Sequence, residues 1–253
     1  MFKRFVQLFN IPMVTRSKAP RAPAASHHKA PRPDRQLAIL LAAEKLFAQR
    51  GYHGVTIRQI AEEAGVPLAL VGYYFGAKHE LFHAIFVHWH GTIEQRLSQL
   101  QHVTERQDNA AKGDRLRLVV EAFVEPVLAQ RASAEGEYYA QLVGRELALP
   151  TPETQRVLTE FFDPLAHRFI DALHATRPGH DRGLAAWAYQ FALGSLLHHI
   201  GDHRITALSR GQYQAADPMA GELLIDFITA GINAVLPLVR SPRANTSTTR
   251  RQA

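Results

Sequence analysis

Two short helical segments joined by a glycine turn, at residues 56–75, constrain this chain more than any other feature. Thr56 and Gln59 have the spacing of a capping box, in which each side chain accepts a hydrogen bond from the other residue's backbone amide. Gly65 is expected to end the first helix, and Pro67 suits the opening turn of the second, where a missing N–H costs nothing. Such a pair describes either a helix-turn-helix or a plain structural hairpin.

The residues of this segment divide into a buried and an exposed set. Ala61 is small enough to sit where the two helices cross, and Val71 is an apolar anchor that should face the core. Phe75 is predicted to fill the core, while Tyr74 could serve either the core or the surface. The second helix should end at Gly76 and therefore presents only two turns.

The rest of the chain also shows helical spacing of apolar residues, with no alternating strand pattern. We therefore predict an all-α fold, with a first helix that ends at Arg50-Gly51 and a long fourth helix over Lys78–Leu100. Pro126 and Pro164 should kink or break the helices that contain them. Further helices are predicted near residues 115–131, 135–149, 152–176, 182–208 and 218–239.

The charge is concentrated at the two ends of the chain. The formal net charge is +6, yet residues 1–35 carry eight Lys or Arg against one acid, and the last fourteen residues carry four Arg and no acid. The basic N-terminal segment is rich in proline and is predicted to be a disordered arm that contacts phosphate, with a solubilising tail as the alternative. Met13 offers an alternative start, which leaves open whether residues 1–12 are native.

Several classes of protein are disfavoured by composition and motif. Cysteine is absent, so neither disulfides nor thiolate metal sites can form, and no apolar run approaches the roughly 20 residues of a membrane-spanning helix. The fourteen histidines include pairs at helical spacing, His79/His83 and His199/His203, but no motif completes a metal site. No P-loop, dinucleotide fingerprint or nucleophile elbow is present, so we expect no enzyme, no metal and no cofactor.

The full run ILLAAEKLFAQRGYHGVTIRQIAEEAGVPLALVGYYFGAKHELF, residues 39–82, resembles the DNA-binding head of the TetR (tetracycline-repressor-like) family of bacterial regulators. The similarity covers about 45 residues and includes the Ala-Ala-x-x-Leu-Phe first helix, the Thr-capped second helix, Ala-Gly-Val and the Tyr-x-Phe end of the recognition helix. It implies a three-helix helix-turn-helix head joined by a long helix to a C-terminal helical bundle for ligand binding and dimerisation. The implied domains are an arm at 1–34, a DNA-binding head at 35–80, a body at 81–239 and a basic tail at 240–253.

The resemblance also implies which residues contact an operator in double-stranded DNA. Thr56, at its helix N-terminus, and Lys78 would hold phosphate, and Tyr73 and Tyr74 would contact phosphate and thymine methyls. Arg58 is a further candidate because it is a cation on the exposed side of its helix. The residues that would face base edges are Pro67, Leu68, Ala69 and Gly72.

This recognition helix departs from the family pattern in its polar groups. Pro67, Leu68 and Ala69 offer none of the Arg, Lys, Asn or Gln side chains that make bidentate base contacts, and Gly72 replaces a position often aromatic in the family. Direct base readout should therefore be thin, with DNA shape, thymine methyls and the arm around Arg32 and Arg35 carrying more of the selectivity. Deleting residues 1–33 should then weaken DNA binding and flatten its salt dependence; unchanged affinity and slope would exclude the arm.

For the body, the resemblance implies an effector site and a dimer interface. The segment GRELALPTPE…FFDPLAHRF…WAYQFALGSLLHH is similar to TetR branches that respond to lipophilic or fatty-acyl effectors. Candidate effector-binding residues are Phe123, Tyr139, Arg145, Glu146, Phe161, Phe162, His167, Trp187 and Phe191; plain core packing is the alternative for each. Candidate dimer-interface residues on the last two helices are Ala192, Leu196, Leu224, Phe227, Ile228 and Ile232.

The predicted function is that of a cytoplasmic, nucleoid-associated bacterial repressor that binds its operator as a homodimer and is released by a small effector. An activator or an effector-independent repressor of the same family is the first alternative. A helical metal-dependent enzyme or an adaptor that carries a helical hairpin by chance is the more distant one. The effector, the operator and the target genes cannot be read from the residues.

Overall fold

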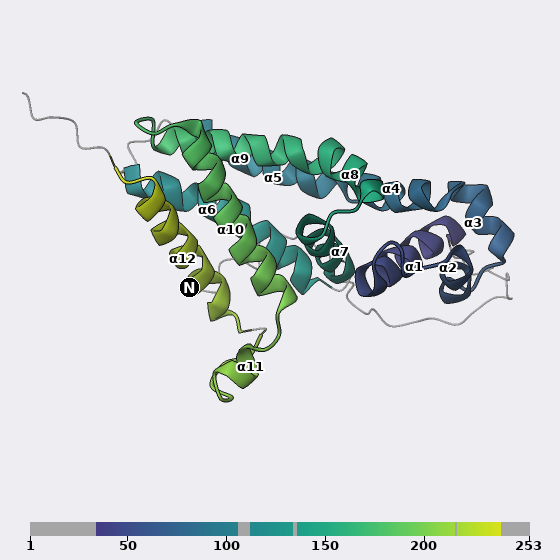
Figure 1. Ribbon diagram of the computed structural model, residues 1–253. Helices are drawn as coiled ribbons and strands as arrows, with labels where there is room; N and C mark the ends of the chain where they lie inside the picture. The colour runs from purple at the N-terminus through teal and green to yellow at the C-terminus, as the bar shows by residue number, and fades with distance from the viewer. Residues whose placement is uncertain (1–33, 106–111, 134–135, 216, 239–253) are drawn as a thin grey trace, which may run out of the picture. The chain divides into compact units, whose positions relative to one another are not determined.

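The structure is a computed structural model that describes residues 34–105, 112–133, 136–215 and 217–238. Within these ranges every regular element is a helix, which confirms the predicted all-α class (Figure 1). The predicted arm up to Pro33, with Arg32, and the tail from residue 239 lie outside the described residues. None of the described helices has the length and apolar content needed to cross a membrane.

Three helices form the head: α1 (Arg35–Arg50), α2 (Ile57–Glu63) and α3 (Leu68–Phe75). Asp34, assigned to the arm from the sequence, caps α1, because its carboxylate accepts from the backbone amides of Gln36 at 3.0 Å and Leu37 at 3.2 Å.

The capping box at the start of α2 is present as predicted. The Thr56 hydroxyl accepts from the Gln59 amide at 3.3 Å, and the Gln59 side chain accepts from the Thr56 amide at 2.8 Å. Gly65 has a φ of 65° in the turn that follows, a conformation that favours glycine. Ala61 and Val71 are buried, as expected for the crossing residue and the anchor, and Phe75 is partly buried against the core.

The predicted fourth helix is not continuous. It divides into α4 (Lys78–His88) and α5 (His90–Glu105), with Trp89 between them outside helical geometry at φ −90° and ψ 5°. The Trp89 indole donates to the Glu44 carboxylate of α1 at 2.7 Å, and its ring stacks on Tyr139 with centroids 5.1 Å apart. These long-range contacts of one side chain accompany the break, and helical periodicity does not reveal them.

The body contains α6 (Lys112–Ala132), α7 (Glu137–Ala148), α8 (Pro152–Val157), α9 (Asp163–Thr176), α10 (Arg182–Gly201), α11 (Ile205–Leu208) and α12 (Met219–Val235). The predicted helix at 182–208 is interrupted, because Asp202 accepts from the backbone amide of Arg204 at 2.8 Å and turns the chain between α10 and α11. α12 ends before the predicted residue 239. Its end is held by Arg177, which donates to the Leu236 carbonyl at 3.2 Å and the Asn233 side chain at 2.5 Å.

The two prolines predicted to disturb helices behave differently. Pro126 lies inside α6, which continues on both sides of it, so the expected break does not occur there. Pro164 lies in the first turn of α9, directly after a π-helical segment, Leu158–Phe162, that separates α8 from α9. A proline in a first turn lacks only an N–H that would be unpaired in any case, so Pro164 does not disturb α9 itself. The irregular geometry is the π-helical segment that lies directly before α9.

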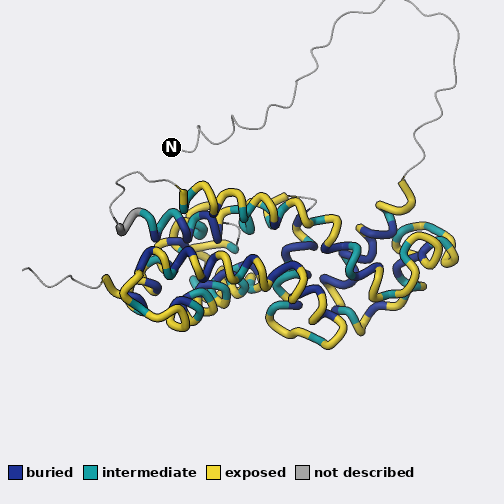
Figure 2. Tube along the Cα trace, turned by 90° about the horizontal axis from the view of Figure 1, so that it is seen from above, coloured by how far each residue is buried: buried dark blue, intermediate teal, exposed yellow. Residues whose placement is uncertain are grey.

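The described helices share one hydrophobic core that runs from the head into the body. α1 packs against α7, α5 against α6 and α9, and α10 against α12. Figure 2 shows buried segments where these helices face one another and exposed turns around α2 and α3. The head is therefore tied to the body through α1 and α7 as well as through the chain connection at α4.

Candidate DNA-binding surface and effector cavity

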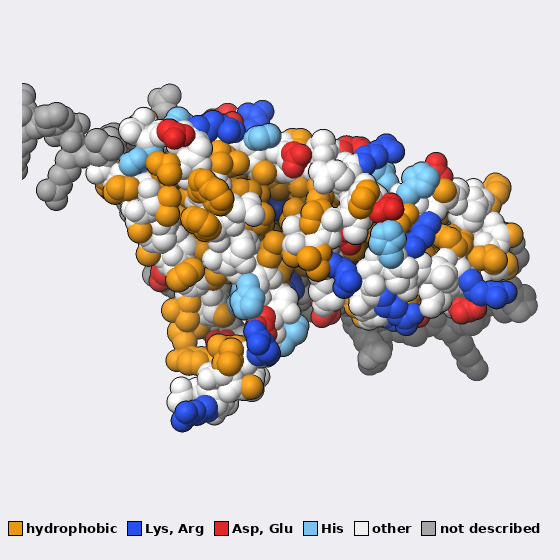
Figure 3. Space-filling model, in the orientation of Figure 1, with side chains coloured by type: hydrophobic (Ala, Val, Ile, Leu, Met, Phe, Trp, Pro, Cys, Tyr) orange, Lys and Arg blue, Asp and Glu red, His pale blue; other side chains and the backbone are white. Residues whose placement is uncertain are grey.

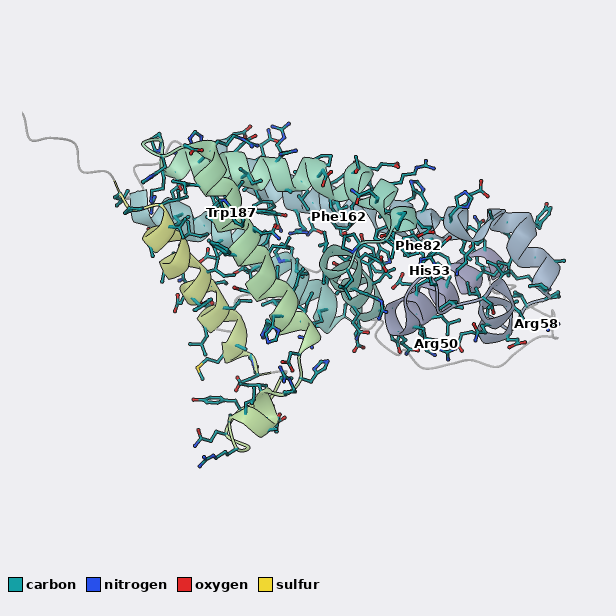
Figure 4. All side chains as sticks on the ribbon, in the orientation of Figure 1. Arg50, His53, Arg58, Phe82, Phe162 and Trp187 are labelled. Atoms are coloured by element: carbon teal, nitrogen blue, oxygen red, sulfur yellow. The ribbon has the colours of Figure 1, made fainter. Side chains whose placement is uncertain are left out.

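The outer face of α2 and α3 is exposed, while the inner face is held by the core. Tyr73 is 79% exposed, Leu68 49% and Tyr74 37%, and Val71 on the opposite side of the same helix is fully buried. The rings of Tyr73 and Tyr74 meet edge to face at 5.2 Å. Thr56, Arg58, Pro67, Ala69 and Gly72, the other contact residues predicted for this surface, are also exposed, as is Arg35 at the start of α1. Arg58 is labelled in Figure 4, far from Trp187 on α10.

Lys78 lies at the start of α4, as predicted, but its ammonium group is already engaged. Its Nζ lies 4.3 Å from the centroid of the Tyr52 ring, an attractive cation–π geometry. Partial burial lowers the pKa of Lys78, and the more distant Glu153 carboxylate opposes this shift. Tyr52, which the sequence reading did not single out, therefore positions the predicted phosphate ligand.

The helix start at Lys78 is capped in a way that the sequence reading missed. Ala77 has no side-chain oxygen to cap α4; instead, the Glu80 carboxylate accepts from the Ala77 amide at 2.7 Å. Gly76 precedes it with a φ of 70°, and a Cβ built on Gly76 would lie 2.1 Å from that carboxylate. Only glycine fits this junction between α3 and α4.

A cavity of about 220 Å³ lies inside the body between α5, α6, α7, α9 and α10. Three of the predicted effector-binding residues line it: Phe123, Tyr139 and Phe162. Apolar side chains of α7 and α10, including Val143 and Leu193, form much of the remaining wall. Three of the nine predicted residues thus line one cavity, whose volume is smaller than that of pockets that hold drug-sized ligands.

Three polar residues of the cavity are ones that the sequence reading did not choose. Arg96, Gln130 and Tyr189 line it together with the predicted Tyr139. Arg96 Nε, Gln130 Nε2 and the Tyr139 hydroxyl are buried without a hydrogen-bond partner in the described part of the chain. The available signal was the position of Arg96 on the apolar stripe of its helix, three residues after Ile93 and four before Leu100, where a cation is unexpected.

The other predicted effector-binding residues lie elsewhere. Arg145 packs on the head, since a Cβ built on Gly51 would lie 2.7 Å from its Nε. Glu146 is buried, and burial raises the pKa of its carboxyl group, although a hydrogen bond with Thr154 lowers it in part. His167 is exposed beside Arg182 at 3.4 Å, and Phe161 packs on Phe86 of α4, with centroids 6.2 Å apart.

Trp187 and Phe191 also lie away from the cavity, on the outer side of α10. They are 60% and 56% exposed, and their rings stack at 5.7 Å (Figure 4). Leu223 and Phe227 of α12 are 56% and 68% exposed. Figure 3 shows hydrophobic side chains, in orange, over α10 and α12. We call these four residues the α10–α12 surface.

The predicted dimer-interface residues divide between the two sides of these helices. Phe227 is exposed and Leu224 partly exposed. The remaining four, Ala192, Leu196, Ile228 and Ile232, are buried within the chain at 5% exposure or less. They are core residues of this fold, because the sequence pattern identified two apolar helices but not which of their faces points outward.

A hydrogen-bonded link joins the head to the cavity wall. Glu44 of α1 is buried and accepts from the Trp89 indole, and Trp89 stacks on Tyr139, whose ring lines the cavity. Burial raises the pKa of Glu44 to about 7, and hydrogen bonds from Trp89 and from the backbone of Tyr139 oppose the rise. A change at the cavity wall can therefore reach a head residue through two side-chain contacts.

No group of three or more His, Asp or Glu side chains among the described residues is arranged to hold a metal ion. His83 instead pairs with Glu160 at 2.9 Å, between α4 and the π-helical segment. His198 pairs with Asp202 at 3.3 Å. These histidines are engaged with single carboxylates, as in ordinary surface contacts.

The short exposed helix α3 follows the capped helix α2 after the turn at Gly65, and this is the arrangement of a helix-turn-helix protein. Comparisons with known proteins identify the family. A model described as bacterial regulatory proteins, tetR family, matches residues 39–85, and one described as the tetracyclin repressor-like C-terminal domain matches residues 121–231. The chain belongs to the TetR family of bacterial regulators, whose members bind DNA operators and form dimers.

Similar proteins include two named regulators and one solved structure. The transcriptional activator FasR of Mycolicibacterium smegmatis is 33% identical over 96 residues, or 38% of this chain and 42% of that protein. The transcriptional regulator HbdR of an Aromatoleum species is 38% identical over 77 residues, or 29% of this chain and 34% of that protein. The matches thus span less than half of each relative.

The solved structure is that of a Clostridium perfringens protein assigned to regulation of fatty acid metabolism. It has a TM-score of 0.51 and 19% identity, and the alignment covers 81% of this chain and all of that one. At this identity the similarity concerns the fold.

Proposed function

We propose that the protein is a sequence-specific DNA-binding transcriptional regulator that acts as a dimeric repressor and is released from its operator by a small molecule. The observation that supports this best is the two-turn helix α3, which is exposed along Leu68, Tyr73 and Tyr74 and anchored by the buried Val71. A helix presented in this way can enter a major groove, while the capped N-terminus of α2 meets the phosphate backbone.

The operator contacts that we propose are those predicted from the sequence, and the exposure of each side chain supports some of them more than others. Thr56 and Arg58 lie at the exposed start of α2, and Tyr73 is the most exposed side chain of α3. Lys78 would reach phosphate only by leaving the Tyr52 ring or by sharing its charge with it. Since α3 carries no bidentate base donor, apolar contact and DNA shape would contribute most of the sequence preference.

We propose that two chains associate through the α10–α12 surface. An apolar patch of this kind on two adjacent helices is typical of a subunit interface, and pairing it with its symmetry copy would form a four-helix bundle. One short recognition helix reads few base pairs, whereas two heads span successive turns of the major groove.

Release would follow from ligand binding in the body cavity. Tyr139 and Phe162 line the cavity, and each also contacts an aromatic residue at the head side: Tyr139 stacks on Trp89, and Phe162 meets the Phe86 ring edge to face at 6.0 Å. A ligand that binds better to one arrangement of these rings shifts the population of head positions, and with it the spacing of the two recognition helices. The domain division at residues 80 and 81 would then place α4 as the connecting element.

The test is selection of bound fragments from the genomic DNA of the host, followed by screening of small molecules for release. We expect a small set of duplexes with two-fold symmetric sites, enriched by the wild-type protein and not by a Tyr73→Ala, Arg58→Ala variant. The control variant Arg168→Ala carries an exposed substitution on α9 and should enrich the same set. A wild-type protein that enriches no duplex would favour the helical adaptor or enzyme instead.

Within the same class, the alternatives are an activator and a repressor that needs no effector. A reporter gene placed behind the selected site distinguishes them by the sign of the response when the chain is removed. We place the protein in the bacterial cytoplasm, associated with the nucleoid, because its proposed partner is genomic DNA.

A further inference from the structure

The body cavity contains a positive charge that nothing nearby balances. Arg96 of α5 is partly buried between α6 and α9, with its guanidinium carbon 5.8 Å from the centroid of the Phe123 ring and 5.7 Å from that of the Phe169 ring. Its Nη2 makes a long contact of 3.4 Å to the Phe123 carbonyl, and its Nε is buried without a partner. Asp163 is the one carboxylate among the described lining residues, and no ion pair joins it to Arg96.

The groups around this cation cannot neutralise it. The ionisable groups that interact with Arg96 are the phenols of Tyr139 and Tyr189. Burial raises the pKa of both phenols, so they remain neutral. An arginine side chain stays protonated in proteins, and burying a charge without a counter-charge is costly. Natural proteins keep such a group where a ligand or a partner completes it.

Two further donors converge on the same cavity. The Gln130 amide nitrogen and the Tyr139 hydroxyl are both buried there without acceptors. Most of the remaining lining residues are aromatic or aliphatic, with Phe162, Leu193 and Leu196 among them, and Thr92, Asp163 and Gln190 are the other polar ones. The cavity thus presents unpaired donors and one positive charge beside mainly apolar walls.

We propose that the ligand of this cavity is a small amphiphilic carboxylate, whose anionic group pairs with Arg96 and whose apolar part lies among the aromatic and aliphatic walls. The proposal rests on the proposed function, since it names the class of molecule that the regulator would sense. Guanidinium and carboxylate match in charge and in their two-pronged hydrogen-bonding geometry. The volume of 220 Å³, about seven water molecules, suits a medium-chain or single-ring acid.

The test compares a carboxylate with a neutral molecule of similar shape on the purified full chain. Octanoate and octan-1-ol form one pair, and 3-phenylpropanoate and 3-phenylpropan-1-ol form a second. Titration calorimetry should give at least one acid a dissociation constant about ten- to a hundred-fold below that of its alcohol, since charged hydrogen bonds contribute this much. Equal binding of acid and alcohol, or binding of neither acid, would overturn the proposal.

Variants of Arg96 assign the preference to this side chain. Arg96→Met should remove the preference for the acid and, because an unbalanced buried charge is gone, raise the thermal midpoint of the ligand-free protein. Arg96→Lys keeps the charge and should retain a reduced preference, which keeps the test usable if the methionine variant fails to fold. Arg168→Met, an exposed substitution on α9, is the matched control. A preference that persists in Arg96→Met would reject the role of Arg96.

Failure of this inference can be separated from failure of the proposed function. If acids bind but no duplex is selected, the cavity assignment stands and the regulator assignment does not. If a duplex is selected and released by an alcohol but by neither acid, the regulator stands and the carboxylate ligand is rejected.

Discussion

The surface of α3 and the body cavity distribute their polar groups in opposite ways. The α3 surface faces solvent, where polar side chains are cheap, yet Leu68, Ala69 and Gly72 leave it nearly without hydrogen-bond donors. In the cavity a buried donor without an acceptor is costly, yet Arg96 Nε and Gln130 Nε2 are buried there without a hydrogen-bond partner. A buried donor without an acceptor lowers the stability of the ligand-free protein, and a ligand that supplies the acceptor would remove this cost. The cavity should therefore discriminate between ligands more sharply than α3 discriminates between bases.

Disruption of the proposed dimer should separate the two regions most strongly, because operator binding by the α3 surface depends on two linked heads and ligand binding in the cavity does not. Phe227→Asp places a charge in the α10–α12 surface and should yield a monomer by light scattering. Operator affinity should then fall by about 100-fold or more, because two linked heads bind with an avidity that one lacks. Ligand affinity in the cavity, measured by calorimetry, should change little.

Leu149→Asp is the matched control for that variant. Leu149 is 72% exposed after α7 and lies outside the α10–α12 surface, so its substitution should leave the dimer and operator binding intact. A Phe227→Asp protein that remains dimeric at micromolar concentration would contradict the proposed interface.

The link between the two regions is expected to respond to pH through Glu44. Its pKa is about 7 in the folded protein, against 4.5 for an unperturbed glutamate, so folding favours the protonated carboxyl group. The resulting stability is fully present below pH 4.5 and is lost as the pH rises through 7. Glu44→Gln keeps an acceptor for Trp89 without ionising, so the wild type should lose up to about 3 kcal/mol relative to this variant between pH 4.5 and pH 8.

Denaturant unfolding of both proteins across this pH range measures the effect, with Glu62→Gln, an exposed change on α2, as the control. A free-energy difference between wild type and Glu44→Gln that does not vary with pH would show that the pKa of Glu44 is the same in the folded and the unfolded protein.

Substitution of Gly72 has the smallest expected effect of these predictions, and it is the most specific to the α3 surface. A Cβ built on Gly72 meets no atom within 4 Å, so Gly72→Ala should stabilise the fold by about 0.5–1 kcal/mol through higher helix propensity. If the α3 backbone approaches the groove closely there, the added methyl group should weaken operator binding a few-fold. Gly91→Ala in α5, where a Cβ also meets nothing within 4 Å, should leave operator affinity unchanged; an equal affinity for Gly72→Ala would exclude close approach.

The sequence predicted the local structure of the head well, because its signals are local. The Thr56–Gln59 capping box, the turn at Gly65 and the buried Val71 all depend on neighbours within a few residues. The break at Trp89 was missed because it involves Glu44 and Tyr139, which are 45 and 50 residues away along the chain.

Predictions for the body were less accurate because an apolar helix has two faces to choose from. Ile228 and Phe227 are adjacent in α12, and only packing decides that the first is buried and the second exposed. The effector-site prediction favoured aromatic residues, of which Phe123, Tyr139 and Phe162 line the cavity, and it did not include Arg96. An unpaired cation is recognisable only when its surroundings are known to lack a carboxylate.

The Glu44–Trp89 hydrogen bond limits where this chain can be joined to the DNA-binding head of another regulator. A graft that exchanges residues up to the end of α4 would separate the carboxylate from its indole donor, although the cut would fall at a helix boundary. An acceptor supplied by the incoming first helix at the position of Glu44 would restore the pair. Heads that lack one should assemble with this body but leave the indole N–H buried and unpaired, and such hybrids should respond poorly to the ligand.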